Sequence, residues 1–157
     1  MNKVIAIANQ KGGVGKTTTA VNIAASLAAT KRRTLLVDLD PQGNATTATG
    51  VNSLTSKTLY SHYFEKTPIN KCIQKTKDNY DVIPGSEELI ALEVSIRSDG
   101  NQAFLSKSLK DLESNYDYTI IDTPPTLNQL TIEGLLCASG TLILLQCEYY
   151  SLEGVAG

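Results

Sequence analysis

Short apolar runs alternate with amphipathic segments along most of the chain. The apolar runs carry few polar residues, which is typical of strands buried on both faces of a parallel sheet, and they lie at residues 3–8, 34–40, 80–85, 118–122 and 141–147. Between them, apolar residues recur at helical spacing and predict helices at residues 16–29, 86–97 (with Ser86 as its N-cap), 101–114 and 127–138. Residues 45–78 are rich in Thr, Ser, Asn and Lys, and there we expect short helices and loops.

The alternation of strands and helices predicts an α/β doubly wound fold, with a mostly parallel sheet and helices on both of its faces. Ligands of such sheets bind at the carboxyl ends of the strands. Three of the predicted strands end in residues suited to ligand binding, namely a glycine-rich loop after residue 8, Asp38 with Asp40, and Asp122. Because these strand ends meet at one edge of the sheet, the sequence predicts a ligand site there.

The glycine-rich loop directly follows the first predicted strand and covers residues 10–18, with the sequence QKGGVGKTT. Glycines let the backbone turn sharply and aim several N–H groups at one anion, and a helix begins immediately afterwards. In this arrangement Lys16 reaches the β- and γ-phosphates of a nucleotide, and the Thr17 hydroxyl ligates Mg²⁺. The standard pattern has glycine where this chain has Gln10, and Lys11 follows instead. The alternative is a flexible turn with two solvated lysines.

Carboxylates end two of the predicted strands. Asp122 at the tip of an apolar strand is expected to hold Mg²⁺ opposite Thr17, and the alternative is that it caps the next helix. Asp38 and Asp40 are two residues apart, so they are expected to point the same way from one strand. We expect Asp40 to position the attacking water and Asp38 to support it near Mg²⁺ or Lys16. The alternative is that one of them only caps or pairs with Lys16.

Composition narrows the class of protein. The chain of 157 residues has 41% apolar and 19% charged residues and a net charge of −2, which is ordinary for a soluble domain and gives no basic patch for nucleic acid.

Cys72, Cys137 and Cys147 have neither metal-ligand nor disulfide spacing, and we expect each to be a small buried residue. We expect His62 to be a packed or surface residue, and the basic residues 31–33 to follow a helix end rather than contact DNA. With no signal peptide and no membrane-spanning run, we expect a cytoplasmic protein.

Together these residues resemble the deviant Walker-A ATPases, and specifically the ParA/Soj type of chromosome and plasmid partition ATPase. The resemblance covers essentially the whole chain and rests on residues 11–18, 37–44 (VDLDPQGN), 120–125 (IIDTPP), 130–131 and 146–154. It implies that the phosphates are bound by Lys11, Gly12, Gly13, Val14, Gly15, Lys16, Thr17 and Thr18. It also implies that Lys11 reaches the ATP of a second subunit, so that ATP holds a sandwich dimer together and hydrolysis releases it.

The resemblance further implies a slow ATPase switch whose γ-phosphate sensor is the segment 123–125. Its partners would be a ParB-type activator protein and, for the dimer of a full-length member, DNA bound without sequence preference on the nucleoid. Members of the family are substantially longer. We therefore expect residues 1–157 to be a single P-loop ATPase domain that lacks the family's last strands and helices, which leaves the strand at 142–145 near an open sheet edge.

Other functions remain open at this stage. A nucleotide-binding module without turnover would result if the missing part is needed for dimerisation. A division-site ATPase that binds membranes would need an amphipathic helix beyond the present sequence, and the run at 122–125 favours partition over it. A nitrogenase-type iron protein would need cluster-ligating cysteines near Thr123, where the sequence has none.

Overall fold

A six-stranded sheet forms the centre of the computed structural model, which describes residues 2–9, 15–100 and 103–144. The strands are β1 (Lys3–Asn9), β2 (Thr34–Asp38), β3 (Gln74–Lys75), β4 (Asp81–Ile83), β5 (Tyr118–Asp122) and β6 (Gly140–Leu144). Their order across the sheet is β3-β4-β2-β5-β1-β6, and only the β3–β4 pair is antiparallel. The predicted doubly wound, mostly parallel α/β fold is confirmed.

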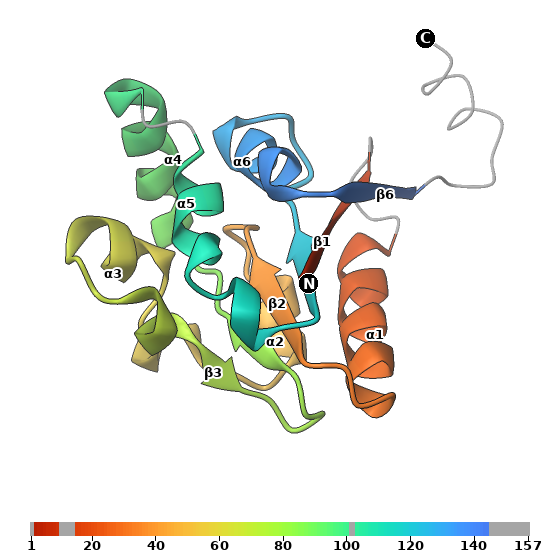
Figure 1. The fold of residues 1–157 in the computed structure, drawn as a ribbon. Coiled ribbons are helices and arrows are strands. Elements are labelled where there is room, and N and C mark those ends of the chain that lie inside the picture. Colours follow the sequence, from red (N-terminus) through yellow and green to blue (C-terminus); the bar gives the residue numbers. More distant parts are fainter. Residues whose placement is uncertain (1, 10–14, 101–102, 145–157) are drawn as a thin grey trace, which may run out of the picture.

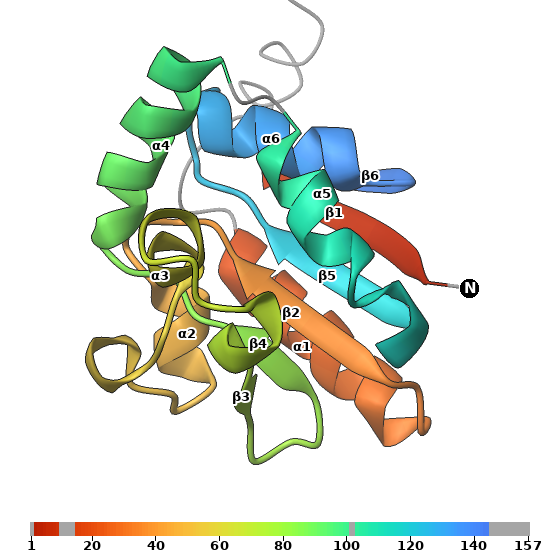
Figure 2. The ribbon, with the colours of Figure 1, turned by 60° about the vertical axis from the view of Figure 1, so that its left-hand side comes forward.

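Helices cover both faces of this sheet (Figures 1 and 2). They are α1 (Lys16–Ala29), α2 (Asn44–Ala48), α3 (Leu59–Phe64), α4 (Glu88–Asp99), α5 (Phe104–Lys110) and α6 (Gln129–Cys137), with 3₁₀ turns at Ser53–Thr55, Ile69–Cys72 and Glu113–Asn115. One core cluster packs the alanines of α1 and α2 against the sheet, and a second packs α3, α4, α5 and α6 against the other face. In Figure 2 the helices α4, α5 and α6 lie above the sheet and α1 lies below it.

The small side chains of α1 explain its close approach to the sheet. Ala20, Ala24 and Ala28 recur at a spacing of four residues and are buried, so one face of the helix lies directly on the strands. The strands beneath are buried throughout, as all five residues of β2 show. This contact fixes the N-terminal end of α1 beside the carboxyl ends of β2 and β5.

Some predicted boundaries were wrong. The strand predicted at 34–40 ends at Asp38, the helix predicted at 86–97 begins at Glu88 with Glu87 in the N-cap position instead of Ser86, and the helix predicted at 101–114 covers only Phe104–Lys110. Residues 45–78 form short helices and loops as expected, but they also hold the unpredicted strand β3. Residues 145–147 of the last predicted strand lie outside the described residues.

Structural roles were expected for the cysteines, His62 and the basic residues 31–33, and Cys72, His62 and Arg33 are packed or paired. Cys72 is buried and Cys137 is half-buried, while Cys147 lies outside the described residues. The ring nitrogens of His62 lie 2.7 Å from the Thr67 carbonyl oxygen and 3.0 Å from the Ser108 hydroxyl, so this side chain is packed. In the basic cluster that follows α1, Arg33 pairs with Asp117. None of the helices in the described part of the chain is both long enough and apolar enough to cross a membrane.

Candidate nucleotide site at the carboxyl edge of the sheet

The carboxyl ends of β2 and β5 bring two aspartates side by side. These strands are parallel neighbours, and Asp38 is the register partner of Asp122. On its other side β5 pairs with β1, where Ile7 is the partner of Asp122. The backbone N–H of Leu39 donates to the Asp122 carbonyl oxygen at 2.9 Å, so the two strand ends are held together beyond the last register pair. The predicted convergence of strand ends on one edge is therefore present.

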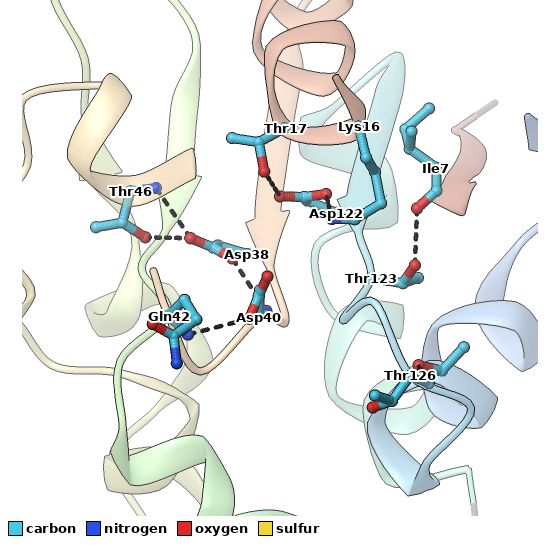
Figure 3. A network of polar contacts seen from close by, with 11 residues as sticks. Ile7, Lys16, Thr17, Asp38, Asp40, Gln42, Thr46, Asp122, Thr123 and Thr126 are labelled. Atoms are coloured by element: carbon cyan, nitrogen blue, oxygen red, sulfur yellow. Dashed lines mark hydrogen bonds and ion pairs between the residues drawn. The ribbon is translucent and has the colours of Figure 1, made fainter. Parts of the chain in front are cut away.

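The first turn of α1 satisfies the Asp122 carboxylate from above. The Lys16 ammonium forms an ion pair with Asp122 Oδ1, and the Thr17 hydroxyl donates to Asp122 Oδ2 at 3.1 Å (Figure 3). Lys16 is 6% exposed and Asp122 is fully buried, so this is a buried pair. Because removing either member leaves an uncompensated charge in the interior, the pair ties α1 firmly to β5.

The helix α1 starts from a residue that only glycine fits easily. Gly15 occupies the N-cap position with φ 80° and makes no side-chain cap, and a Cβ added there would meet open space. The first N–H groups of α1 therefore have no side-chain cap at Gly15, the condition under which a helix start binds anions. Lys11, Gly12, Gly13 and Val14 lie outside the described residues, and Thr18 is exposed on α1.

The surroundings of Asp38 and Asp122 disfavour bare carboxylates. Burial raises the pKa of Asp122, while the ammonium of Lys16 and the hydroxyl of Thr17 act against this rise. Burial also raises the pKa of Asp38 to about 6, against the hydrogen bonds from Thr46. The negative charge of Asp122 on the neighbouring strand adds to the rise of the Asp38 pKa.

Asp40 does not share a strand face with Asp38, and this prediction was wrong. The strand ends at Asp38 because its own carboxylate accepts the Asp40 N–H at 3.0 Å and turns the chain. Asp40 lies in that turn, 5% exposed, where its Oδ1 accepts from the Gln42 N–H at 3.0 Å. Its carbonyl oxygen accepts from the Gly43 N–H at 2.9 Å. Asp40 therefore faces the site from a loop.

Of the alternatives considered for the aspartates, capping of a helix start by Asp38 is found, since its carboxylate accepts the Thr46 N–H in the first turn of α2 at 2.9 Å. The Lys16 ammonium pairs with Asp122, and neither Asp38 nor Asp40 takes that place. The helix after β5 is capped by Asn128, whose side chain accepts from the Thr131 N–H at 3.1 Å, so Asp122 is not its cap.

The segment after Asp122 is anchored at its start. The Thr123 hydroxyl donates to the Ile7 carbonyl oxygen at 2.8 Å, and the Thr131 hydroxyl donates to the Thr126 carbonyl oxygen at 2.5 Å. Between these anchors, Leu127 is 82% exposed. A cavity of about 350 Å³ lies along this segment and is lined by residues of β1, α6 and β6 as well. Thr123 is therefore fixed to the sheet, and the exposed part of the loop lies beyond it.

Two residues of the site were not found from the sequence. Thr46 and Gly85 contact Asp38 from α2 and from the loop after β4, and no pattern in the chain connects positions this far apart. The signal available was the threonine-rich run at 46–49, which we assigned to short helices and loops.

The oxygen atoms at this edge fit a Mg²⁺ ion that keeps part of its water shell. Mg²⁺ sites in nucleotide-binding proteins use one or two carboxylates, a hydroxyl and substrate phosphates, and do not need a dedicated protein cage. The Thr17 hydroxyl and the Asp122 carboxylate lie within hydrogen-bonding distance of one another. In the part of the chain that the structure describes, no group of three or more His, Cys, Asp or Glu residues could hold a metal by itself.

A parallel sheet with a lysine–threonine helix start facing an aspartate of a neighbouring strand defines the class of P-loop NTPase-like proteins. A family model described as "AAA domain" matches residues 2–157, and the chain belongs to that family, within it to the ParA/Soj partition ATPases. It is 47% identical over 160 residues to "Chromosome partitioning protein ParA" of Myxococcus xanthus, covering 99% of this chain and 56% of the relative. It is 43% identical over 159 residues to "Sporulation initiation inhibitor protein Soj" of Bacillus subtilis, covering 99% of this chain and 63% of the relative.

A solved structure shares the fold closely. The crystal structure of cobyrinic acid a,c-diamide synthase from Mycobacterium smegmatis, with a bound ATP analogue and magnesium, superposes with a TM-score of 0.93 at 35% identity. The match covers 99% of this chain and 65% of that structure. The present chain thus spans about three fifths of the length of the relatives it matches.

Proposed function

We propose that this chain is the nucleotide-binding part of a ParA-type ATPase switch, which binds ATP with Mg²⁺ and hydrolyses it slowly. The observation that carries the proposal is the meeting of Lys16, Thr17 and Asp122 at the carboxyl edge of the sheet. These are the residue types that hold phosphate and magnesium in P-loop proteins, and they come from two different elements. The relatives add support, because one solved structure with this fold holds an ATP analogue and magnesium.

Each residue has a defined task under this proposal. The backbone N–H groups of Gly12–Thr18 cradle the phosphates, and the Lys16 ammonium leaves Asp122 for the β- and γ-phosphate oxygens. Thr17 and Asp122, supported by Asp38, would hold Mg²⁺, which would supply positive charge at those oxygens. Asp40 orients a water molecule toward the γ-phosphate from its turn.

Replacing Lys16 tests the phosphate site. In Lys16→Ala we expect ATP affinity, measured by calorimetry, to fall by more than about tenfold, because a charged hydrogen-bond donor to the phosphates is lost. The variant also leaves Asp122 buried without its cation, so its unfolding must be followed in parallel.

The controls separate binding from folding. Lys16→Arg keeps the charge opposite Asp122, and Lys110→Ala removes an exposed lysine on α5. A folded Lys16→Ala protein that binds ATP as tightly as the unchanged chain would show that the loop is not a phosphate site.

Dimerisation and the partners also belong to the proposal. By family resemblance, Lys11 neutralises the phosphates of ATP in a second subunit, so ATP holds an ATP-dependent homodimer together. A ParB-type activator protein would stimulate hydrolysis, and the full-length dimer would bind DNA without sequence preference at the nucleoid in the cytoplasm. The domain would comprise residues 1–157.

A variant of Lys11 tests the dimer. In Lys11→Ala we expect ATP affinity to stay within about twofold while the ATP-dependent dimer disappears in sedimentation, since the residue acts on the partner's nucleotide. ADP-bound chain is the reference for the monomer. The same dimer in Lys11→Ala and in the unchanged chain would contradict the role across the interface.

A nucleotide-binding module without turnover is the second candidate. The chain spans 56% to 63% of the curated relatives described above, so the turnover of a whole relative is not carried over to it. Phosphate release by this chain, compared with release by a full-length relative at equal nucleotide occupancy, separates the two functions.

A further inference from the structure

Thr46 is a buried residue at the candidate site to which the proposed function gives no task. It lies in α2 and is 2% exposed. Its hydroxyl donates to Asp38 Oδ2 at 2.7 Å (Figure 3). The same hydroxyl accepts from the Gly85 N–H at 2.8 Å. Its backbone N–H donates to the same Asp38 oxygen at 2.9 Å. One side chain therefore joins the ends of β2 and β4 to the start of α2.

The Asp38 carboxylate links Thr46 to Asp40. Asp38 Oδ2 is occupied by the two donors of Thr46, while Oδ1 accepts the Asp40 N–H at 3.0 Å. The carboxylate thus bridges Thr46 on one side and the backbone of Asp40 on the other. Because Oδ1 of the Asp40 side chain accepts from the Gln42 N–H, the position of its second oxygen, Oδ2, follows the position of this turn.

Close packing leaves the Asp38 carboxylate little room to move. A Cβ added to Gly85 would lie 2.8 Å from Asp38 Cγ and 2.8 Å from the Asp38 carbonyl oxygen. A Cβ added to Gly43, which has φ 65°, would lie 2.9 Å from the Gly85 carbonyl oxygen. Glycine allows these close approaches because it has no Cβ. The loop after β4 is therefore in direct contact with the Asp38 carboxylate, which accepts the Asp40 N–H and so determines the turn.

We propose that Thr46 is a positioning residue for hydrolysis, which places Asp40 through the Asp38 carboxylate and locks it to the loop after β4. The proposal rests on the proposed ATPase function and on the role of Asp40 within it. It predicts an effect on turnover but not on nucleotide binding, because Thr46 has no contact with Lys16, Thr17 or Asp122 among the hydrogen bonds of the described residues.

The variant that tests this is Thr46→Val, which keeps the shape of the side chain and removes the hydroxyl. We expect kcat for phosphate release to fall by about 10- to 100-fold, since small displacements of a water-positioning group cost this much, while the Kd for ATP stays within about twofold. Thr46→Ser keeps the hydroxyl and should restore kcat to near the unchanged value. Thr34→Val is the matched control, because Thr34 is also 2% exposed, and its hydroxyl donates to the Arg32 carbonyl oxygen at 3.0 Å, at the opposite end of β2 from Asp38.

Two further measurements distinguish a positioning role of Thr46 from a purely structural role. In an Asp40→Ala background, Thr46→Val should add no further loss, because residues that act through one another are not additive. Gly85→Ala keeps every hydrogen-bonding group but pushes a methyl against Asp38, and it should lower kcat with unchanged Kd as well. This second variant keeps the test available if Thr46→Val fails to fold.

The outcomes separate the two proposals. If the unchanged chain releases no phosphate, the proposed turnover fails and the positioning role fails with it. If the unchanged chain turns over and folded Thr46→Val and Gly85→Ala do so at the same rate, only the positioning role is overturned. A loss in Thr46→Val that persists undiminished in the Asp40→Ala background also overturns it.

Discussion

Asp122 is held at the carboxyl edge by an ammonium and a hydroxyl from one turn of α1. The sequence predicted Thr17 beside Asp122, with Mg²⁺ between them, because an acid at the tip of an apolar strand needs a cation nearby. It did not predict that Lys16 itself forms the pair, since the two residues are 106 positions apart and their meeting depends on how α1 packs on the sheet. Thr46 was missed for the same reason, as its task arises only once α2 turns back onto Asp38.

Removing the carboxylate of Asp40 tests its role at the residue scale. In Asp40→Ala we expect phosphate release to fall by about 100-fold or more, with ATP binding retained, because the water loses the group that orients it. Asp40→Asn is the closer variant, since its amide oxygen can still accept from the Gln42 N–H and keep the turn. Normal turnover in Asp40→Asn, measured at saturating ATP, would show that the Asp40 carboxylate does not orient the attacking water.

At the scale of elements, prediction succeeded where the local pattern was strong. The helix at 16–29 and the strand at 118–122 were predicted at their observed bounds. The regularly spaced alanines of the first segment favour only a helix, and the β-branched residues of the second favour only a strand. The helix predicted from residue 101 begins at Phe104 instead, where Ala103 has φ 65° and the Glu133 carboxylate of α6 accepts the Phe104 N–H. That start is set by a contact between helices, which a local pattern does not contain.

The short helix α2 offers a matched pair of glycines for an element-scale test. Gly43 and Gly50 flank it with φ 65° and 80°, but only Gly43 lies close to another backbone atom. Gly50→Ala should lower the free energy of unfolding by about 1 kcal/mol through backbone strain alone. Gly43→Ala should cost about 1–3 kcal/mol more, because its methyl meets the Gly85 carbonyl oxygen. Denaturant unfolding of both variants measures the difference, and equal losses would contradict the tight contact between α2 and the loop after β4.

At the scale of the whole molecule, the fold class followed from the alternation of strands and helices. The strand order could not be predicted in this way, because it depends on which connections cross which face of the sheet. Strand β3 was not predicted because it is only two residues long and pairs antiparallel with β4. The two faces of the sheet also differ in the size of the helix side chains that pack on them. α1 lies close on one face through alanines, whereas four helices with larger side chains cover the other.

The stability of the whole molecule should depend on the charge of Glu133. This side chain of α6 is 1% exposed, and burial raises its pKa above the ordinary 4.5, against the backbone N–H groups at the start of α5. The unfolded chain therefore releases this proton first, and stability falls as pH rises above about 4.5 until the folded group ionises as well. Glu133→Gln cannot ionise and lacks this loss.

The measurement is the difference in the free energy of unfolding between Glu133→Gln and the unchanged chain at several pH values. We expect the difference to shift in favour of glutamine as the pH rises above about 4.5, since only the unchanged chain must ionise a buried carboxyl group. The exposed Glu113→Gln serves as the control and should give a flat difference. A flat difference for Glu133→Gln too would contradict the raised pKa.

Among the described residues of this rim, Asp38 and Asp122 lie side by side in register with Asp40 just beyond, and they carry more negative charge than the Lys16 ammonium balances. An uncomplexed triphosphate brings further negative charge to the rim and is repelled. Under the proposed function, this rim would discriminate between ionic forms of the ligand: nucleotide would bind together with its counter-ion, and a change in free magnesium would alter occupancy even when the nucleotide pool is constant.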